Sequence, residues 1–293
     1  MSGTPSRPTS YWDYIRVEPL LDLQRGIAAS ERELTDDEVR FIVIHQVDEL
    51  WFKLVLRELV TARDLFARVP VPEDALAGAV ASLRRITLCF DLASQQFRLM
   101  ETMRTQDYLT FRDKLNPASG FQSAQMREVE VLLGLPDEDR IPLGNEASYL
   151  EALRSHDGSP SPAYERVQRR IADRPTLKTA VDAWLQRTPI DGSTPGTPGD
   201  DAVVSRFVER YLAGHEELYA RAQRCAIAVQ ALTKADEERL RARYRAQLQG
   251  ARRHLEAEDV PAAQRSWVRR LRAAILFVDS NRTLPLLSWP RLR

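Results

Sequence analysis

The stretch over residues 35–68, TDDEVRFIVIHQVDELWFKLVLRELVTARDLFAR, constrains the fold most, because it predicts one long helix that is apolar on two faces. Thr35 and Glu38 have the spacing of a capping box, which fixes the start of the helix. One apolar face carries Phe41, Ile44, Phe52, Val55 and Leu59, and the other carries Val43, Val47, Leu50 and Leu54. We expect such a helix to be central and largely buried.

His45 is a polar residue in the middle of this apolar helix. It lies one turn from Phe41 and one turn from Glu49, on the same side of the helix. A buried polar side chain needs a partner, so the ring either forms a hydrogen bond within the core or faces a cavity. The core histidine is the commoner outcome, and the pattern alone leaves both open.

The rest of the chain also predicts helices, and strand patterns are nearly absent. Prolines at 70 and 72 end the first long helix, and a second one over residues 73–103 is expected to return antiparallel to it. A short helix carries residues 108–115, and another ends at Gly134. Residues 135–162 and 188–201 are predicted surface loops, because they are rich in Pro, Gly, Ser and Asp. We expect an all-α fold, with a disordered N-terminus over residues 1–10 and a single domain over residues 11–293.

Tyr108 and Arg112 are four residues apart, hence on one face of a helix, and a small-residue loop over residues 116–120 follows them. An arginine beside a tyrosine in this position suits a two-pronged clamp on a carboxylate. The alternative is an ordinary salt bridge to Asp107, Asp113 or a more distant acid. The pattern favours neither reading over the other.

The N-terminal segment Tyr11-Trp12-Asp13-Tyr14-Ile15 holds three aromatic rings that need a surface to pack on. It either docks on the protein's own core or reaches a neighbouring subunit.

In the C-terminal half, His215 and His254 lie among charged residues, where a solvated role is the commoner one. The arginines of the last helix indicate a solvated basic face rather than a nucleic-acid site, since no aromatic residues interleave them; they are Arg265, Arg269, Arg270 and Arg272.

Charge and composition exclude several functions. The 42 basic and 42 acidic residues cancel, so there is no overall field to attract nucleic acid or a membrane surface. No run approaches the ~18 apolar residues of a membrane span, and the start has no apolar signal segment, which predicts a cytoplasmic protein. Two cysteines and four histidines show no zinc-binding spacing.

Three blocks together resemble the tryptophan 2,3-dioxygenase family of heme enzymes. They are the pair Tyr11 and Tyr14, the segment FIVIHQVDELWFK at 41–53, and METM followed by DYLTFRDKLNPASGFQSAQ within 100–125. The resemblance is dense over residues 11–135 and weaker through 181–189 and 272–287. It implies an all-α homotetramer, a dimer of dimers, that uses heme b and O2 to open the indole ring of L-tryptophan to N-formylkynurenine in the kynurenine pathway.

The resemblance also implies roles for individual residues. His45 would be the catalytic residue that hydrogen-bonds the indole N–H, and Phe41 would pack against the indole. Arg112 would hold the substrate carboxylate, with Tyr108 beside it. The other implied positions are Ile42, Val43 and Ile44 in the substrate pocket, Phe97 and Ser119 at the heme, and Tyr11, Tyr14 and Ile15 as a cap from a neighbouring subunit.

The chain departs from the family's pattern at the iron. The family's axial histidine follows the segment matched by residues 272–292, and a Gly-Thr-Gly-Gly loop comes after it; this chain ends at Arg293. No proximal ligand can be assigned, so we expect the chain as written to bind heme weakly. The leading hypothesis is a dioxygenase. The alternatives are a monooxygenase of tryptophan or a substituted tryptophan, and a heme-less tryptophan-binding homologue.

Overall fold

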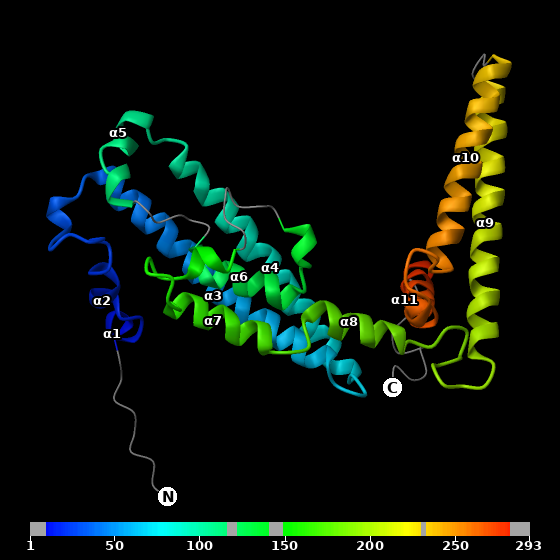
Figure 1. The fold of residues 1–293 in the computed structure, drawn as a ribbon, viewed down its shortest axis with the longest axis horizontal. Helices are drawn as coiled ribbons and strands as arrows, with labels where there is room; N and C mark the ends of the chain where they lie inside the picture. Colours follow the sequence, from blue (N-terminus) through cyan, green and yellow to red (C-terminus); the bar gives the residue numbers. More distant parts are fainter. Residues whose placement is uncertain (1–9, 116–121, 141–148, 230–232, 282–293) are drawn as a thin grey trace, which may run out of the picture. The chain divides into compact units, whose positions relative to one another are not determined.

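The computed structural model describes residues 10–115, 122–140, 149–229 and 233–281 (Figure 1). All regular elements in these ranges are helices, and one isolated bridge joins Ile190 to Ser193. The all-α prediction is therefore confirmed. The chain divides into two compact units, the first made of residues 1–60 and 81–174 and the second of residues 61–80 and 175–293. The predicted single domain over residues 11–293 stays a prediction.

Two long helices, α3 (Asp36–Phe66) and α4 (Glu73–Met100), match the two predicted from the sequence. Thr35 begins α3, since its Oγ1 accepts a hydrogen bond of 3.2 Å from the backbone N–H of Glu38. The buried Glu38 carboxylate accepts from Lys114 Nζ at 2.7 Å, which ties the chain after α4 to the start of α3.

The predicted antiparallel arrangement of α3 and α4 is confirmed within the first unit. Arg85 of α4 donates two hydrogen bonds of 2.7 Å to Glu58 of α3. Gln96, further along α4, donates to Asp48, which comes earlier in α3. The pairs run in opposite order along the two helices, so the helices run in opposite directions.

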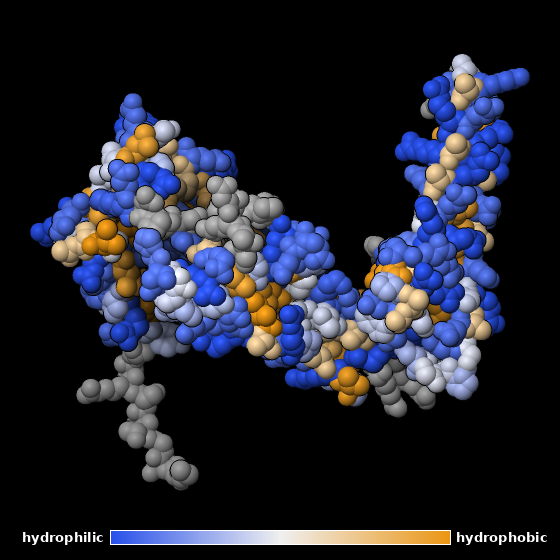
Figure 2. All heavy atoms as spheres, viewed as in Figure 1, coloured by the Kyte–Doolittle hydropathy of each residue, from blue (hydrophilic) through white to orange (hydrophobic). Residues whose placement is uncertain are grey.

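Only one of the two apolar faces of α3 is buried. Ile44, Val55 and Leu59 are no more than 3% exposed. Val43, Leu50 and Leu54 on the second face are 38%, 48% and 46% exposed, so the prediction that both faces are buried is wrong. The helices of a single chain cover α3 on one side, and Figure 2 shows further hydrophobic residues at the surface of the first unit.

The first unit is completed by short helices, in which η marks a 3-10 helix. They are α1 (Tyr11–Tyr14), α2 (Val17–Leu21), η1 (Glu31–Glu33), α5 (Thr105–Leu109), η2 (Arg112–Leu115), α6 (Ala124–Leu133), η4 (Asp137–Asp139), η5 (Glu151–Leu153) and α7 (Pro162–Ala172). Gly134 ends α6 with φ 91°, a conformation that glycine adopts without strain, as expected. Helix α7 is held to α6 by the buried Glu128, which binds Arg166 and Arg170.

The predicted single helix over residues 108–115 is instead two short helices, α5 and η2. Phe111 lies between them and is 1% exposed, because the chain turns there to place this ring in the core. Tyr108 therefore lies on α5, whereas Arg112 begins η2. The helical spacing on which the Tyr108 and Arg112 pairing was based is not present.

The second unit contains α8 (Leu177–Gln186), α9 (Asp200–Val229), α10 (Lys234–Leu255) and α11 (Ala262–Ser280), together with the adjoining ends of α3 and α4. Helices α9 and α10 lie side by side (Figure 1). The core of this unit is formed by Ile190, Val204, Phe207, Val208, Leu212, Leu255, Ala273 and Ala274.

The prediction of a surface loop over residues 188–201 is confirmed for residues 191, 192 and 196–199, which are exposed, and is wrong for the buried positions. Thr188, Ile190 and Ser193 are buried, with Ile190 part of the core. The reason is Arg270, whose Nη2 donates to the carbonyl oxygens of Thr188 and Ser193 at 3.1 and 3.2 Å. Arg270 is 5% exposed and pairs with Asp200 at 3.2 Å, so it does not belong to the predicted solvated basic face.

The other arginines of α11 differ in how far they reach solvent. Arg265 is exposed, whereas Arg269 is half-buried against Glu256. Arg272 binds Asp259 and holds the pKa of that carboxyl at about 2. In the described ranges, no helix is both long and apolar enough to cross a membrane.

Candidate functional site

Phe41, His45 and Tyr108, to which the resemblance gives roles in the site, share one aromatic cluster in the first unit. The ring of Phe41 lies 4.1 Å from His45, 6.3 Å from Tyr108 and 5.6 Å from Phe111, measured between ring centroids. Tyr108 meets Phe111 edge to face at 5.4 Å. Phe111 is fully buried, whereas Phe41, His45 and Tyr108 are half-buried. The cluster therefore presents partly open aromatic surface beside an imidazole.

The His45 ring is fixed by its own helix. Its Nδ1 lies 2.7 Å from the backbone oxygen of Phe41, one turn earlier. A carbonyl oxygen only accepts, so Nδ1 must carry the proton, and in the neutral ring Nε2 is then an acceptor. Of the two alternatives from the sequence, the hydrogen bond within the protein is present, since Nδ1 bonds to its own helix. The half-buried ring keeps Nε2 as an acceptor for an N–H donor.

Arg112 is exposed and follows directly after the buried Phe111. The proposed salt bridge to Asp107 does not occur, because Asp107 accepts two hydrogen bonds, of 2.7 and 3.0 Å, from Arg104. Among the described residues no acid pairs with Arg112. Arg112 is thus an exposed arginine that follows a member of the aromatic cluster in the chain and has no acid partner among the described residues, which suits a carboxylate that comes from outside.

Two glutamines that the sequence reasoning missed hold α3 around His45. Gln96 of α4 donates through Nε2 to the Ile44 carbonyl, at 3.3 Å, and to the Asp48 carboxylate. Gln125 of α6 donates through Nε2 to the carbonyl and to the carboxylate of Glu49, both at 2.7 Å.

Asp48 gave a signal in the sequence that could have pointed to this arrangement. It is an acid on the buried side of an apolar helix, and such a group requires a partner. Burial raises the pKa of Asp48, and the hydrogen bond from Gln96 and the nearby His45 oppose that rise.

Comparisons with known proteins show the family of the chain. A family model described as Tryptophan 2,3-dioxygenase matches residues 3–257. The chain belongs to the tryptophan 2,3-dioxygenase family. The tryptophan 2,3-dioxygenase of Sorangium cellulosum is 52% identical over 289 residues, which cover 98% of this chain and 69% of that protein. The tryptophan 2,3-dioxygenase 2 of Ralstonia nicotianae is 49% identical over 288 residues, 97% of this chain and 76% of that protein. A tryptophan 2,3-dioxygenase-like protein of Xanthomonas campestris is 48% identical over 64% of this chain.

The remaining residues that the tryptophan 2,3-dioxygenase resemblance assigned to the site fall in different surroundings. Ile44 is buried, Ile42 is half-buried, and Val43 is exposed. Phe97, assigned to the heme pocket, is 48% exposed on α4. Ser119, assigned to the heme, and the rest of the loop over residues 116–120 lie outside the described residues.

The N-terminal residues assigned as a cap are strongly exposed. Tyr11 and Tyr14 in α1 are 76% and 78% exposed, and Ile15 is 41% exposed. Their rings are therefore not docked on the core of their own chain, which was one of the two sequence alternatives.

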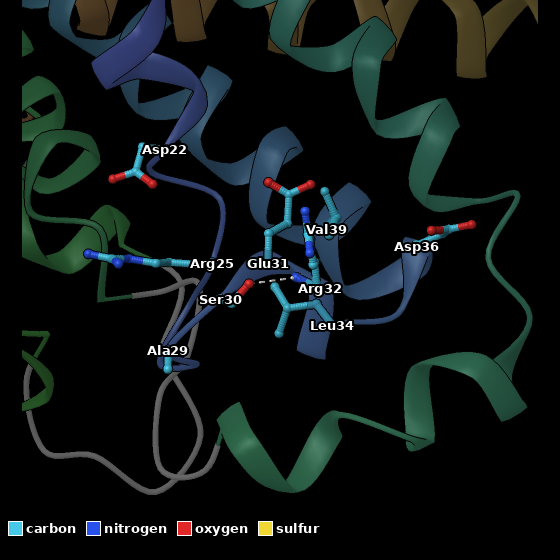
Figure 3. A pocket seen from close by; sticks show the side chains of 9 residues that line it. All are labelled: Asp22, Arg25, Ala29, Ser30, Glu31, Arg32, Leu34, Asp36 and Val39. Atoms are coloured by element: carbon cyan, nitrogen blue, oxygen red, sulfur yellow. Dashed lines mark hydrogen bonds between the residues drawn. The ribbon is translucent and has the colours of Figure 1, made fainter.

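A separate pocket of about 670 Å³ opens beside the start of α3 (Figure 3). Its lining is Asp22, Arg25, Ala29, Ser30, Glu31, Arg32, Leu34, Asp36 and Val39. Most of these side chains are charged or polar, and Figure 3 shows the Ser30 hydroxyl oxygen accepting from the Arg32 backbone N–H. An indole ring would lose apolar contact there, so the aromatic cluster at Phe41 is the better candidate for a tryptophan site.

Proposed function

We propose that the protein is a heme-dependent dioxygenase that converts L-tryptophan and O2 to N-formylkynurenine. The observation that carries this proposal is the fixed His45 ring, whose Nε2 is an acceptor beside the partly open rings of Phe41 and Tyr108. An indole needs these two features, an apolar face and an acceptor for its single N–H. Relatives named tryptophan 2,3-dioxygenase, about half identical over nearly the whole chain, support the same reaction.

Each residue of the site then has a defined part. The Arg112 guanidinium binds the substrate carboxylate, with Tyr108 beside it. His45 Nε2 accepts the indole N–H, and Phe41 packs against the ring. Holding the substrate at both ends fixes which edge of the indole meets the oxidant, and such positioning lowers the barrier by removing orientational freedom.

Heme supplies O2 activation in this family. Its iron needs an axial ligand, usually a histidine, and the chain has four histidines. His156 and His254 are exposed, and His215 is packed between the rings of Tyr211 and Tyr219, at 4.6 and 5.8 Å. His45 faces the substrate side. These four residues do not fit the axial position, so the described chain fits the tryptophan side of the site and not the iron side.

The assembly is also part of the proposal. The exposed rings of Tyr11 and Tyr14, and the exposed second face of α3, support a homotetramer in which the N-terminal segment caps a neighbouring subunit's site. The absence of a membrane-spanning helix among the described residues is compatible with the cytoplasmic location that we propose.

A turnover assay under ¹⁸O2 tests the reaction. With L-tryptophan, a reductant and excess hemin, we expect N-formylkynurenine that carries two labelled oxygen atoms, and no product without hemin. With equimolar hemin we expect little heme uptake in the Soret band, because no histidine fits the axial position. One labelled atom would indicate a monooxygenase, and tryptophan binding with neither heme nor turnover would indicate the heme-less homologue.

A further inference from the structure

Two carboxylates flank His45 on its own helix. Asp48 lies three residues later and Glu49 four residues later, the spacings at which side chains on a helix meet. Because the Phe41 carbonyl already requires a proton on Nδ1, a carboxylate can engage Nε2 only if the ring takes a second proton. That proton would turn the acceptor into a donor.

Both carboxylates already accept a hydrogen bond from a glutamine amide. Gln96 Nε2 donates to Asp48, and Gln125 Nε2 donates to Glu49 Oε2 at 2.7 Å. The orientation of the Gln125 amide is set from its other side, where Oε1 accepts from Arg166 Nη2 at 3.4 Å. An arginine cannot accept a hydrogen bond, so the amide nitrogen must face Glu49.

We propose that Gln96 and Gln125 are positioning residues that engage the Asp48 and Glu49 carboxylates in competition with the His45 ring, and so keep Nε2 an acceptor. Both amides also bind α3 carbonyls, those of Ile44 and Glu49, so each spans the helix backbone and a carboxylate at once. A neutral amide suits this purpose. A lysine or arginine in its place would bind the carboxylate but add a positive charge beside the imidazole.

Other polar groups around this side of α3 do not replace the two amides. Arg166 of α7 is bound to the buried Glu128, and the Tyr108 ring lies 6.3 Å from the Phe41 ring, measured between centroids. The importance of an acceptor for an indole N–H rests on the proposed function. The protonation of the His45 ring does not depend on the proposed function. The role of the two glutamines and the proposed function can therefore fail separately.

The test is the imidazole ¹⁵N spectrum of the free protein at neutral pH, which distinguishes the neutral Nδ1–H ring from the doubly protonated one. In Gln125→Leu we expect the ratio of neutral to doubly protonated His45 to fall by about threefold or more, because the freed Glu49 carboxylate attracts a charged ring. Gln125→Glu repels Glu49 without leaving a cavity, and should shift the ratio in the same direction. Gln96→Leu should also lower the ratio, because it frees the Asp48 carboxylate.

Gln122→Leu is the matched control, because Gln122 Nε2 donates to the backbone carbonyl of Ala152. Adding Glu49→Gln to Gln125→Leu should restore the ratio, since the competing charge is gone. The proposal is overturned if the Gln125 variants match Gln122→Leu, or if the double variant stays shifted. If the Gln125 variants change the His45 protonation ratio as expected but the protein does not bind L-tryptophan, the role of Gln125 is upheld and the proposed function is contradicted.

Discussion

Arg112→Ala is expected to weaken L-tryptophan binding by roughly 30-fold or more, because a charge-assisted, two-pronged contact contributes about 2–3 kcal/mol. His45→Ala should cost only about fivefold, the equivalent of one neutral hydrogen bond of about 1 kcal/mol. The order follows from the structure, in which no described acid pairs with Arg112 and its guanidinium is available to a carboxylate. Calorimetric titration of both variants measures the two losses.

Arg104→Ala is the control for this experiment. Arg104 is also an exposed arginine close to Tyr108, but it already binds Asp107. Its removal should leave tryptophan binding within about twofold of the unmutated protein, since exposed ion pairs of this kind contribute little. Equal losses in Arg112→Ala and His45→Ala would mean that the carboxylate is held elsewhere.

Arg270→Ala is expected to lower the free energy of unfolding by about 3–5 kcal/mol, because it leaves the buried Asp200 carboxylate without its partner. The carbonyl oxygen of Thr188 loses its Arg270 donor in the same variant, and that of Ser193 keeps only the Ile190 backbone N–H. Ser193 Oγ still donates to Asp200 at 2.6 Å, which offsets only part of the charge. Urea denaturation followed by circular dichroism gives the difference.

Arg269→Ala is a matched comparison at the residue of α11 that directly precedes Arg270. Arg269 pairs with Glu256 at 2.7 Å, and the side chains of this pair are 19% and 31% exposed. Water can therefore replace the lost contact, and we expect a cost of about 1 kcal/mol or less. A cost as small as this in Arg270→Ala would mean that water enters the core around residues 188–201.

The sequence was sufficient for the two long helices α3 and α4. The cap at Thr35, the apolar spacing along α3 and the glycine after α6 are local signals, and each predicted an observed element. His45 and Phe41, one helical turn apart, could be paired for the same reason. Tyr108 joined them only through the family resemblance, because its approach to Phe41 depends on how the chain folds back after α4.

The errors arose where a distant residue decides the outcome. Residues 188–201 have the composition of a surface loop. One buried arginine about 80 positions later binds the carbonyl oxygens of Thr188 and Ser193, and these residues and Ile190 are buried. The second apolar face of α3 is indistinguishable in sequence from a buried one. Gln96 and Gln125 look like ordinary polar helix residues until the structure places them against Asp48 and Glu49.

A structure of the protein with L-tryptophan bound tests the central claim most directly. We expect the indole N–H to donate to His45 Nε2, the indole to pack against Phe41, and the carboxylate to bind Arg112. Tryptophan found in the charged pocket beside the start of α3, or bound with neither His45 nor Arg112 in contact, would contradict it.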